Sequence, residues 1–220
     1  MKKLILLLFI PLVFACSDDS SDDSSDDNTN PVYLDTNGVT IKARDWAVVG
    51  DQGTIDGITY TIVNRETLVN MIANQEDLTR ICTSRVINMS DLFYNINSFN
   101  GFSIIQDISS WDVSNVISMQ RMFFNATEFN ISINHWDVSS VADMSYMFSC
   151  AWVFNQPLNS WDVSNVTNMQ GMFSCTQEFN QSLSNWNVSN VTDCSSFCQN
   201  ATNWSLPKPN FSNCGDTGCD

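Results

Sequence analysis

The chain is short of histidine and of basic side chains. It contains one His, and 9 Lys and Arg residues stand against 24 Asp and Glu, so the net charge at pH 7 is −15. One imidazole provides no histidine pair for a metal site and argues against His-dependent catalytic triads. A chain this acidic is also repelled by nucleic acid and by anionic membrane surfaces. These shortages disfavour nucleic-acid-binding proteins, His-based metalloproteins and triad hydrolases.

Long apolar runs are also missing, because none approaches the roughly 20 residues that a membrane-spanning helix needs. Leu4 to Phe14 is an apolar run of eleven residues behind Lys2 and Lys3, as in a secretory signal peptide. The run is followed by Ala15-Cys16, which resembles the lipobox of bacterial lipoproteins. The resemblance implies a signal peptide over 1–15 and a lipid on the Cys16 sulfur. The alternative is an ordinary cleaved signal followed by a chance cysteine.

Residues 16–30 have the composition of a tether. Ser17 to Asp27 contains six Asp, the rest Ser, with no apolar and no basic residue. Such a segment has nothing to bury and repels itself, so we expect an extended chain. It also resembles the surface-export signal of lipoproteins in the Bacteroidetes group. That resemblance implies a lipid-anchored protein of the bacterial outer membrane, exposed at the cell surface; the alternative is a plain spacer.

The second half of the sequence repeats every 25 residues. The phrase Trp-Asp-Val-Ser-Asn-Val, or a close variant, opens at Trp111, Trp136, Trp161 and Trp186. Downstream columns repeat in register, among them Met119, Met144, Met169 and Cys194; Met122, Met147, Met172 and Phe197; and Phe123, Phe148, Phe173 and Cys198. A weaker copy with a five-residue insertion near 101–105 precedes them. Registered copies of this kind predict a solenoid.

Each repeat predicts two short elements. The Trp-Asp-Val-Ser-Asn-Val phrase alternates apolar and polar residues, which favours a short strand with its apolar face inward. The Met-x-x-Met-Phe phrase brings apolar side chains to one side of a single helical turn. We expect a leucine-rich-repeat-like solenoid of short parallel strands and short helical turns. Its core is a ladder of Trp, Val, Met, Phe and Leu that stacking buries.

The pattern Met-x-x-Met-Phe, then Phe-Asn-x-x-Leu-x-x-Trp-Asp-Val-Ser-Asn-Val, resembles the BspA-type leucine-rich-repeat surface proteins of bacteria. The resemblance covers about 31–204 and departs in the last copy, where Asn187, Cys194 and Cys198 replace Asp, Met and Phe. It implies a right-handed leucine-rich-repeat-like solenoid at the cell surface, in some members linked to adhesion. The family carries no catalytic residues and no cofactor, so we expect neither here.

The segments on either side of the repeats read as caps. In residues 31–80 we expect strands over 38–42 and 57–63, then a helix over 65–73 capped by Asn64, together a small α+β cap. Residues 81–205 hold four to five repeats, and 206–220 form a Cys-containing C-terminal cap.

Seven cysteines follow Cys16, and an exported protein can form disulfides. Cys150 and Cys175 occupy one column of adjacent repeats, and a spacing of about 4.8 Å between coils fits a disulfide. The other disulfide candidates are Cys194, Cys198, Cys214 and Cys219, for which a zinc site is the weaker alternative. Cys82 is then the odd thiol, either free or bridged to the leading module.

Two polar features have structural and functional alternatives. The column Asp112, Asp137, Asp162 and Asn187 suggests either turn hydrogen bonds or, less well, a calcium ladder. Arg121, Tyr146 and Trp152 lie where the repeats vary, and their residue types are favoured at binding hot spots. Scattered surface side chains are the alternative for these three.

We therefore expect a non-catalytic surface repeat protein that binds an extracellular protein or glycan and contacts the membrane through its lipid alone. The alternative is a structural envelope spacer or periplasmic scaffold without a specific ligand.

Overall fold

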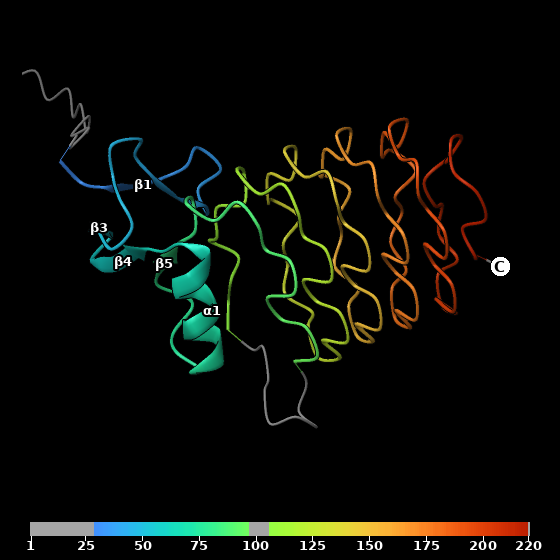
Figure 1. The fold of residues 1–220 in the computed structure, drawn as a ribbon, viewed down its shortest axis with the longest axis horizontal. Coiled ribbons are helices and arrows are strands. Elements are labelled where there is room, and N and C mark those ends of the chain that lie inside the picture. The colour runs from blue at the N-terminus through green and yellow to red at the C-terminus, as the bar shows by residue number, and fades with distance from the viewer. Residues whose placement is uncertain (1–28, 97–105, 220) are drawn as a thin grey trace, which may run out of the picture.

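The computed structural model describes residues 29–96 and 106–219. The signal peptide, Cys16, nearly all of the tether and the five-residue insertion expected near 101–105 lie outside the described residues. Regular secondary structure gathers near the N-terminal end (Figure 1). Its elements in chain order are β1 Val32–Leu34, β2 Ile41–Ala43, β3 Gln52–Ile55, β4 Ile58–Ile62, α1 Arg65–Ala73 and β5 Ile81–Cys82.

The strands form two small sheets. β1 and β2 pair antiparallel, while β4 pairs antiparallel with β3 and parallel with β5. Asp56 and Gly57 connect β3 to β4 with φ values of 50° and 78°, as a two-residue hairpin turn with two left-handed positions requires. The strand expected over 57–63 is confirmed as β4, whereas the strand expected over 38–42 is displaced to 41–43 as β2.

The helix over 65–73 is confirmed as α1. The Asn64 side chain accepts a hydrogen bond from the Thr67 N–H at 2.9 Å, so the cap expected from the sequence is present. Leu68 is fully buried, and Met71 and Ile72 pack against the same core cluster. This helix lies against the first repeat, where its Arg65 end meets the repeat backbone (Figure 1).

The expected leucine-rich-repeat-like solenoid is wrong. Within the described residues the strands form only two small sheets, neither closed nor curled, and α1 is the one helix. After β5, the described residues of the repeats (83–96 and 106–205) contain no strand beyond single-residue bridges and no helix. The Trp-Asp-Val-Ser-Asn-Val phrase turns instead of extending, because the Val116 N–H donates to the Val113 carbonyl and the Asp112 carboxylate accepts from the Ser114 N–H.

Successive repeats nevertheless lie side by side (Figure 1). One parallel bridge per repeat links equivalent positions, in the order Asn88, Ser118, Asp143, Asn168 and Asp193. After each bridge, alternate N–H groups donate to carbonyls of the next repeat. In one repeat the donors are Met119, Arg121, Phe123 and Asn125, at 2.8–2.9 Å from their acceptors. We call this set of bonds the ladder.

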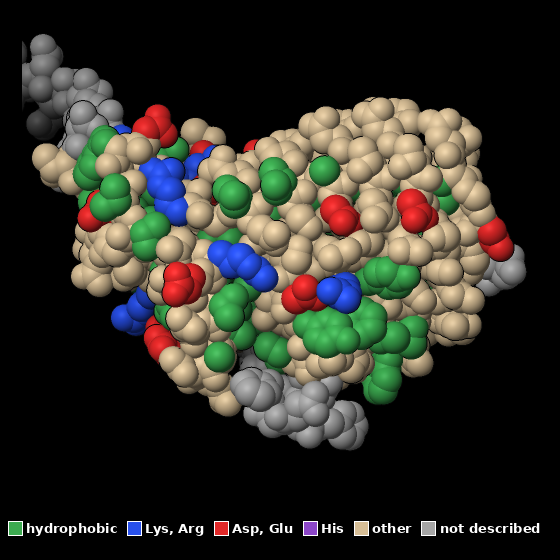
Figure 2. All heavy atoms as spheres, viewed as in Figure 1, with side chains coloured by type: hydrophobic (Ala, Val, Ile, Leu, Met, Phe, Trp, Pro, Cys, Tyr) green, Lys and Arg blue, Asp and Glu red, His purple; other side chains and the backbone are tan. Residues whose placement is uncertain are grey.

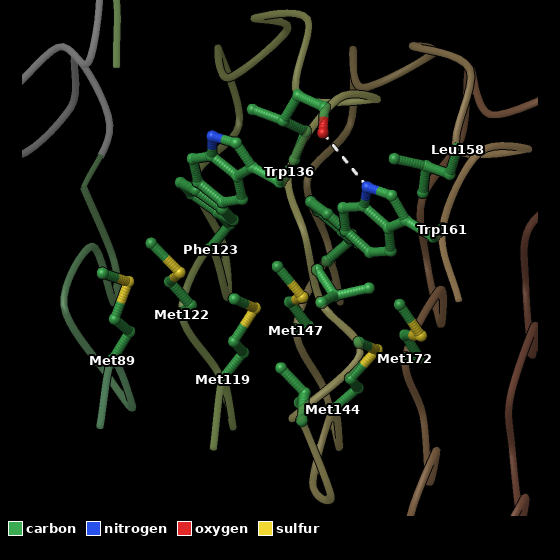
Figure 3. Close-up of a cluster of buried hydrophobic side chains, with 14 of the residues drawn as sticks. Met89, Met119, Met122, Phe123, Trp136, Met144, Met147, Leu158, Trp161 and Met172 are labelled. Carbon is green, nitrogen blue, oxygen red and sulfur yellow. Dashed lines mark hydrogen bonds between the residues drawn. The ribbon is translucent and has the colours of Figure 1, made fainter. Parts of the chain in front are cut away.

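The core follows the apolar columns that the sequence predicted. The Trp, Val, Met, Phe and Leu positions of the repeats are buried in one cluster that reaches from Val63 to Trp204. Equivalent phenylalanine rings stack along the repeats. The centroid of Phe148 lies 5.7 Å from that of Phe123 and 5.5 Å from that of Phe173. Figure 3 shows the methionine columns packed below the indoles. Equivalent aromatic side chains therefore contact each other across adjacent repeats, so the core depends on stacking.

The indoles differ in one respect that predicts a difference in stability. Trp161 Nε1 donates to the Ile133 carbonyl at 3.0 Å, whereas buried Trp136 Nε1 has no partner within the described chain (Figure 3). We expect Trp161→Phe to lower the free energy of unfolding by about 1 kcal/mol more than Trp136→Phe. The two changes remove the same volume, so urea unfolding of both variants isolates the hydrogen bond. Equal losses would contradict this assignment.

Candidate functional site

The ladder places two residues of each repeat in the left-handed region, where a turn needs a positive φ at its third residue. The first column contains Asp91, Arg121, Tyr146, Gly171 and Ser196, with φ between 52° and 61°. The second column contains Asn95, Asn125, Cys150, Cys175 and Asn200, with φ between 54° and 62°. Asn and Gly tolerate this conformation best, so Arg121, Tyr146 and the two cysteines occupy positions that the backbone does not favour for them.

Arg121 lies at the centre of an aromatic surface cluster. Its Nε lies 2.8 Å from Asp91 Oδ1, and its guanidinium carbon lies 5.7 Å from the centroid of the Tyr94 ring. Tyr94 in turn stacks on Phe124, with centroids 5.0 Å apart and planes 11° apart. Tyr94 is 42% exposed. We call Asp91, Tyr94, Arg121 and Phe124 the Arg121 patch.

The Tyr146 ring lies over a glycine of the next repeat. A Cβ on Gly171 would lie 2.4 Å from Tyr146 Cε1, so the ring occupies space that only glycine leaves open in the next repeat. Arg121 and Tyr146 are equivalent residues of adjacent repeats, and the Arg121 N–H donates to the Ser145 carbonyl. Trp152 lies six residues beyond Tyr146 and is 40% exposed. Within the described residues no ion pair, ring stacking or cation–π contact joins the Tyr146 or Trp152 side chain to the Arg121 patch, so these interactions do not bring the three predicted binding residues into one site.

Charged side chains are sparse over the repeats on the face that Figure 2 shows. Figure 2 shows hydrophobic side chains gathered beside a basic and acidic pair over the repeats, with polar uncharged surface around them. Hydrogen bonds from Ser164 and Ser195 hold the pKa values of Asp162 and Asp193 below the usual value. Stability from these two carboxylates is present above the usual pKa of aspartate and is lost as the pH falls through the lowered values. In the column of Asp112, Asp137, Asp162 and Asn187, each side chain accepts a hydrogen bond from the N–H of the Ser two residues later, which favours the structural reading of that column.

Cys150 and Cys175 are separate thiols in this structure. Burial raises the pKa of Cys150 to about 12, and its hydrogen bond with the Cys175 thiol adds to the shift. The two side chains are therefore in contact across adjacent repeats, as the 25-residue spacing predicted, and a disulfide between them stays a prediction.

The left-handed backbone at Cys150 makes a test possible. We expect Cys150→Asn to leave the free energy of unfolding unchanged within about 0.5 kcal/mol, because Asn occupies the equivalent position 125 and favours positive φ. Cys150→Val should lower it by about 1–2 kcal/mol, since a β-branched residue is strained there. Urea unfolding under reducing conditions measures both values. Equal effects of Asn and Val would show that backbone conformation does not govern this column.

The C-terminal cysteines form two disulfides. Cys194 pairs with Cys214, and Cys198 pairs with Cys219, with Cα atoms 5.6 and 4.9 Å apart. In this pairing none of the four is a thiolate, so the zinc alternative has no support. The disulfides fix the tail so that the Ser196 and Cys198 N–H groups donate to the Asp216 and Thr217 carbonyls, at 3.3 and 3.2 Å. The tail thus supplies acceptors for two of the four ladder donors of the last repeat.

Cys82, the predicted odd cysteine, is a buried free thiol that contacts the Ser84 hydroxyl at 3.4 Å. Burial raises its pKa. Ser84 accepts from the Ala43 N–H in β2 and donates to the Asp112 carboxylate in the first Trp-Asp phrase. This network joins the N-terminal sheets to the repeats, and its groups are all occupied by structural contacts.

Residues 29–96 and 106–219 contain neither a metal-ligand cluster nor a candidate membrane-spanning helix. No cluster of three or more His, Cys, Asp or Glu side chains suited to a metal occurs in them. None of their helices is long and apolar enough to cross a membrane.

A family model described as "Mycoplasma protein of unknown function, DUF285" matches residues 64–104 and 100–211, more than half of the chain. The chain belongs to this DUF285 family. The matches cover α1 and the repeats, and the DUF285 description assigns no activity. Searches of the curated proteins and of the solved structures found no match. The DUF285 membership establishes the kind of repeat and leaves the function to be argued from the surface.

Sequence reasoning found Arg121 and Tyr146 but missed Tyr94, Phe124 and Asp91. The sequence did contain a signal for these residues. When the five-residue insertion is left out, the first repeat aligns with the second and Asp91 occupies the position equivalent to Arg121. Tyr94 and Phe124 align in the same way. Aligning the repeats with one another could therefore have predicted the stacked pair of Tyr94 and Phe124. The contact between Arg121 and the Tyr94 ring could be seen only in the structure.

Proposed function

We propose that this DUF285 protein is a lipid-anchored, BspA-type surface protein of the bacterial outer membrane. It binds an extracellular protein or glycan and performs no catalysis. The lipobox-like Ala15-Cys16 and the acidic Ser/Asp tether support the anchor and the surface location. The repeat phrases support the relationship to BspA-type proteins.

The observation that carries the binding proposal is the Arg121 patch. The repeats fix their core columns, but the patch lies on variable positions, so its aromatic residues are not required for packing. Tyr, Trp and Arg dominate the energetics of protein interfaces. Rings that stack and lie in a largely uncharged surface also suit the apolar faces of sugars (Figure 2). An aromatic cluster around a paired arginine therefore provides a rigid surface for either ligand class.

The remainder of the chain provides little for catalysis. A nucleophile needs a base within hydrogen-bonding distance and room for a substrate. The buried Cys82, Ser84 and Asp112 come nearest to such a set, but their groups serve the junction between sheets and repeats. These features support a binding role over an enzymatic one.

The test is a screen of purified protein against arrays of glycans and of extracellular matrix proteins, followed by binding measurements with any hit. Tyr94→Ala and Arg121→Ala should each weaken binding about tenfold or more. Val48→Ser, which alters an exposed apolar side chain of the N-terminal module, is the matched control and should bind as wild type. Hits that survive both patch variants would place binding elsewhere, and failure on all arrays would favour a structural spacer.

A further inference from the structure

The first repeat leaves the N-terminal edge of the ladder partly open. In every later repeat, four carbonyls accept from the preceding repeat, at the positions of Ser118, Gln120, Met122 and Phe124. The equivalent carbonyls of the first repeat are Asn88, Ser90, Leu92 and Tyr94, and no repeat precedes them. The first two are satisfied, because Arg65 donates to Asn88 at 3.1 Å and to Ser90 at 2.9 Å. One guanidinium thus replaces two N–H groups of a missing repeat.

The other two carbonyls differ from the first two. Within the described chain nothing donates to the Leu92 or the Tyr94 carbonyl. Beside them lies a pocket of about 530 Å³ between α1 and the first repeat. Its lining includes Val69, Ile72, Ala73 and Ile96, and it is mostly apolar. An unsatisfied edge of backbone acceptors therefore borders an apolar pocket.

We propose that this edge binds an extended peptide segment of a protein partner. An extended chain presents N–H groups on one side at every second residue, roughly 7 Å apart. Alternate spacing is also how the ladder's own donors reach these carbonyl positions in every later repeat. Binding by addition of a strand to an open backbone edge is an established mode of peptide recognition. The pocket takes an apolar side chain of the same segment.

The chemistry of the edge selects this occupant. The Leu92 and Tyr94 carbonyls need two N–H donors at the spacing of alternate residues. The pocket lining between α1 and the repeat offers apolar contacts, and the Arg65 guanidinium is already hydrogen-bonded to the Asn88 and Ser90 carbonyls. A second copy of the chain cannot continue the stack end to end, because the C-terminal edge is covered by the disulfide-bonded tail. The site adjoins the Arg121 patch, since Asp91 and Tyr94 belong to both, but the carbonyl edge and the α1 side of the pocket lie outside the patch, and the proposal does not depend on the proposed function.

A phage-displayed library of random linear peptides, selected on the purified protein, tests the proposal. We expect peptides whose binding is lost in Val69→Lys, which places a charge in the pocket, and kept in Asn70→Lys. Asn70 is exposed on the same helix outside the pocket lining, so it controls for charge and folding. Neither Val69 nor Asn70 is a residue of the Arg121 patch.

Synthetic versions of these peptides then test the backbone bonds. Methylation of two alternate backbone nitrogens should weaken binding about tenfold, whereas methylation elsewhere should not. The proposal is overturned if no selected peptide is sensitive to Val69→Lys or if alternate N-methylation has no effect. It is also overturned if Val69→Lys dissolves a dimer of the wild-type protein, because the edge would then belong to a second copy.

Discussion

Replacing Cys214 and Cys219 together with serine should lower the free energy of unfolding by about 5 kcal/mol. The two disulfides close loops with sequence separations of 20 and 21 residues, and closing a loop of this length contributes about 3 kcal/mol. The loops overlap, so the second bridge constrains a shorter path and contributes somewhat less. The tail also supplies the acceptors for Ser196 and Cys198, and these bonds weaken when the tail detaches.

Urea unfolding of the double variant, compared with the oxidised wild type, measures this loss. Cys175→Asn is the matched control, because it removes a cysteine that is free in the structure and leaves both bridges in place. Reduced wild type should unfold at the same urea concentration as the serine variant. A decrease in the free energy of unfolding below about 1 kcal/mol would mean that the disulfide-bonded tail does not stabilise the last repeat.

The second large effect is expected at Asp112. Asp112→Ala should lower the free energy of unfolding by about 2–3 kcal/mol, whereas Asp162→Ala should cost less than about 1 kcal/mol. Both side chains accept from a Ser two residues later, but Asp112 is 3% exposed and also accepts from Ser84. Removing it leaves the Ser84 hydroxyl buried without its acceptor, at the junction between β2 and the repeats.

Thermal or urea unfolding of the two variants gives the comparison within one repeat column. Asp112→Asn should recover part of the loss, since its amide oxygen still accepts a hydrogen bond. Equal costs at 112 and 162 would show that the junction contributes no more than an ordinary turn.

The periodicity of the sequence was sufficient to predict which residues form the core, but not the conformation of the backbone. Columns such as Phe123, Phe148 and Phe173 are buried and stacked as predicted, because burial depends on repeating apolar residues. The strands and helical turns were wrong, because Asp and Ser in the Trp-Asp-Val-Ser phrase bond to the local backbone and form turns. Apolar alternation over six residues could not distinguish these outcomes.

The candidate site was predictable only in part. Arg121 and Tyr146 stood out as variable positions, but their left-handed backbone was not visible in the sequence. The recurrence of Asn95, Asn125 and Asn200 in one column was a signal for positive φ that could have been used. The role of Arg65 in replacing a missing repeat depends on how α1 packs, which no local pattern encodes.

Protease treatment of intact cells, followed by mass spectrometry of the released peptides, tests most directly whether the repeats are exposed at the cell surface. We expect peptides from residues 31–220 to be released without lysis, because a lipid-anchored chain with its repeats outside the cell is accessible to the enzyme. A cytoplasmic protein analysed in the same samples controls for leakage. Complete protection of the repeats, with cleavage only after the envelope is broken, would contradict the surface-binding function.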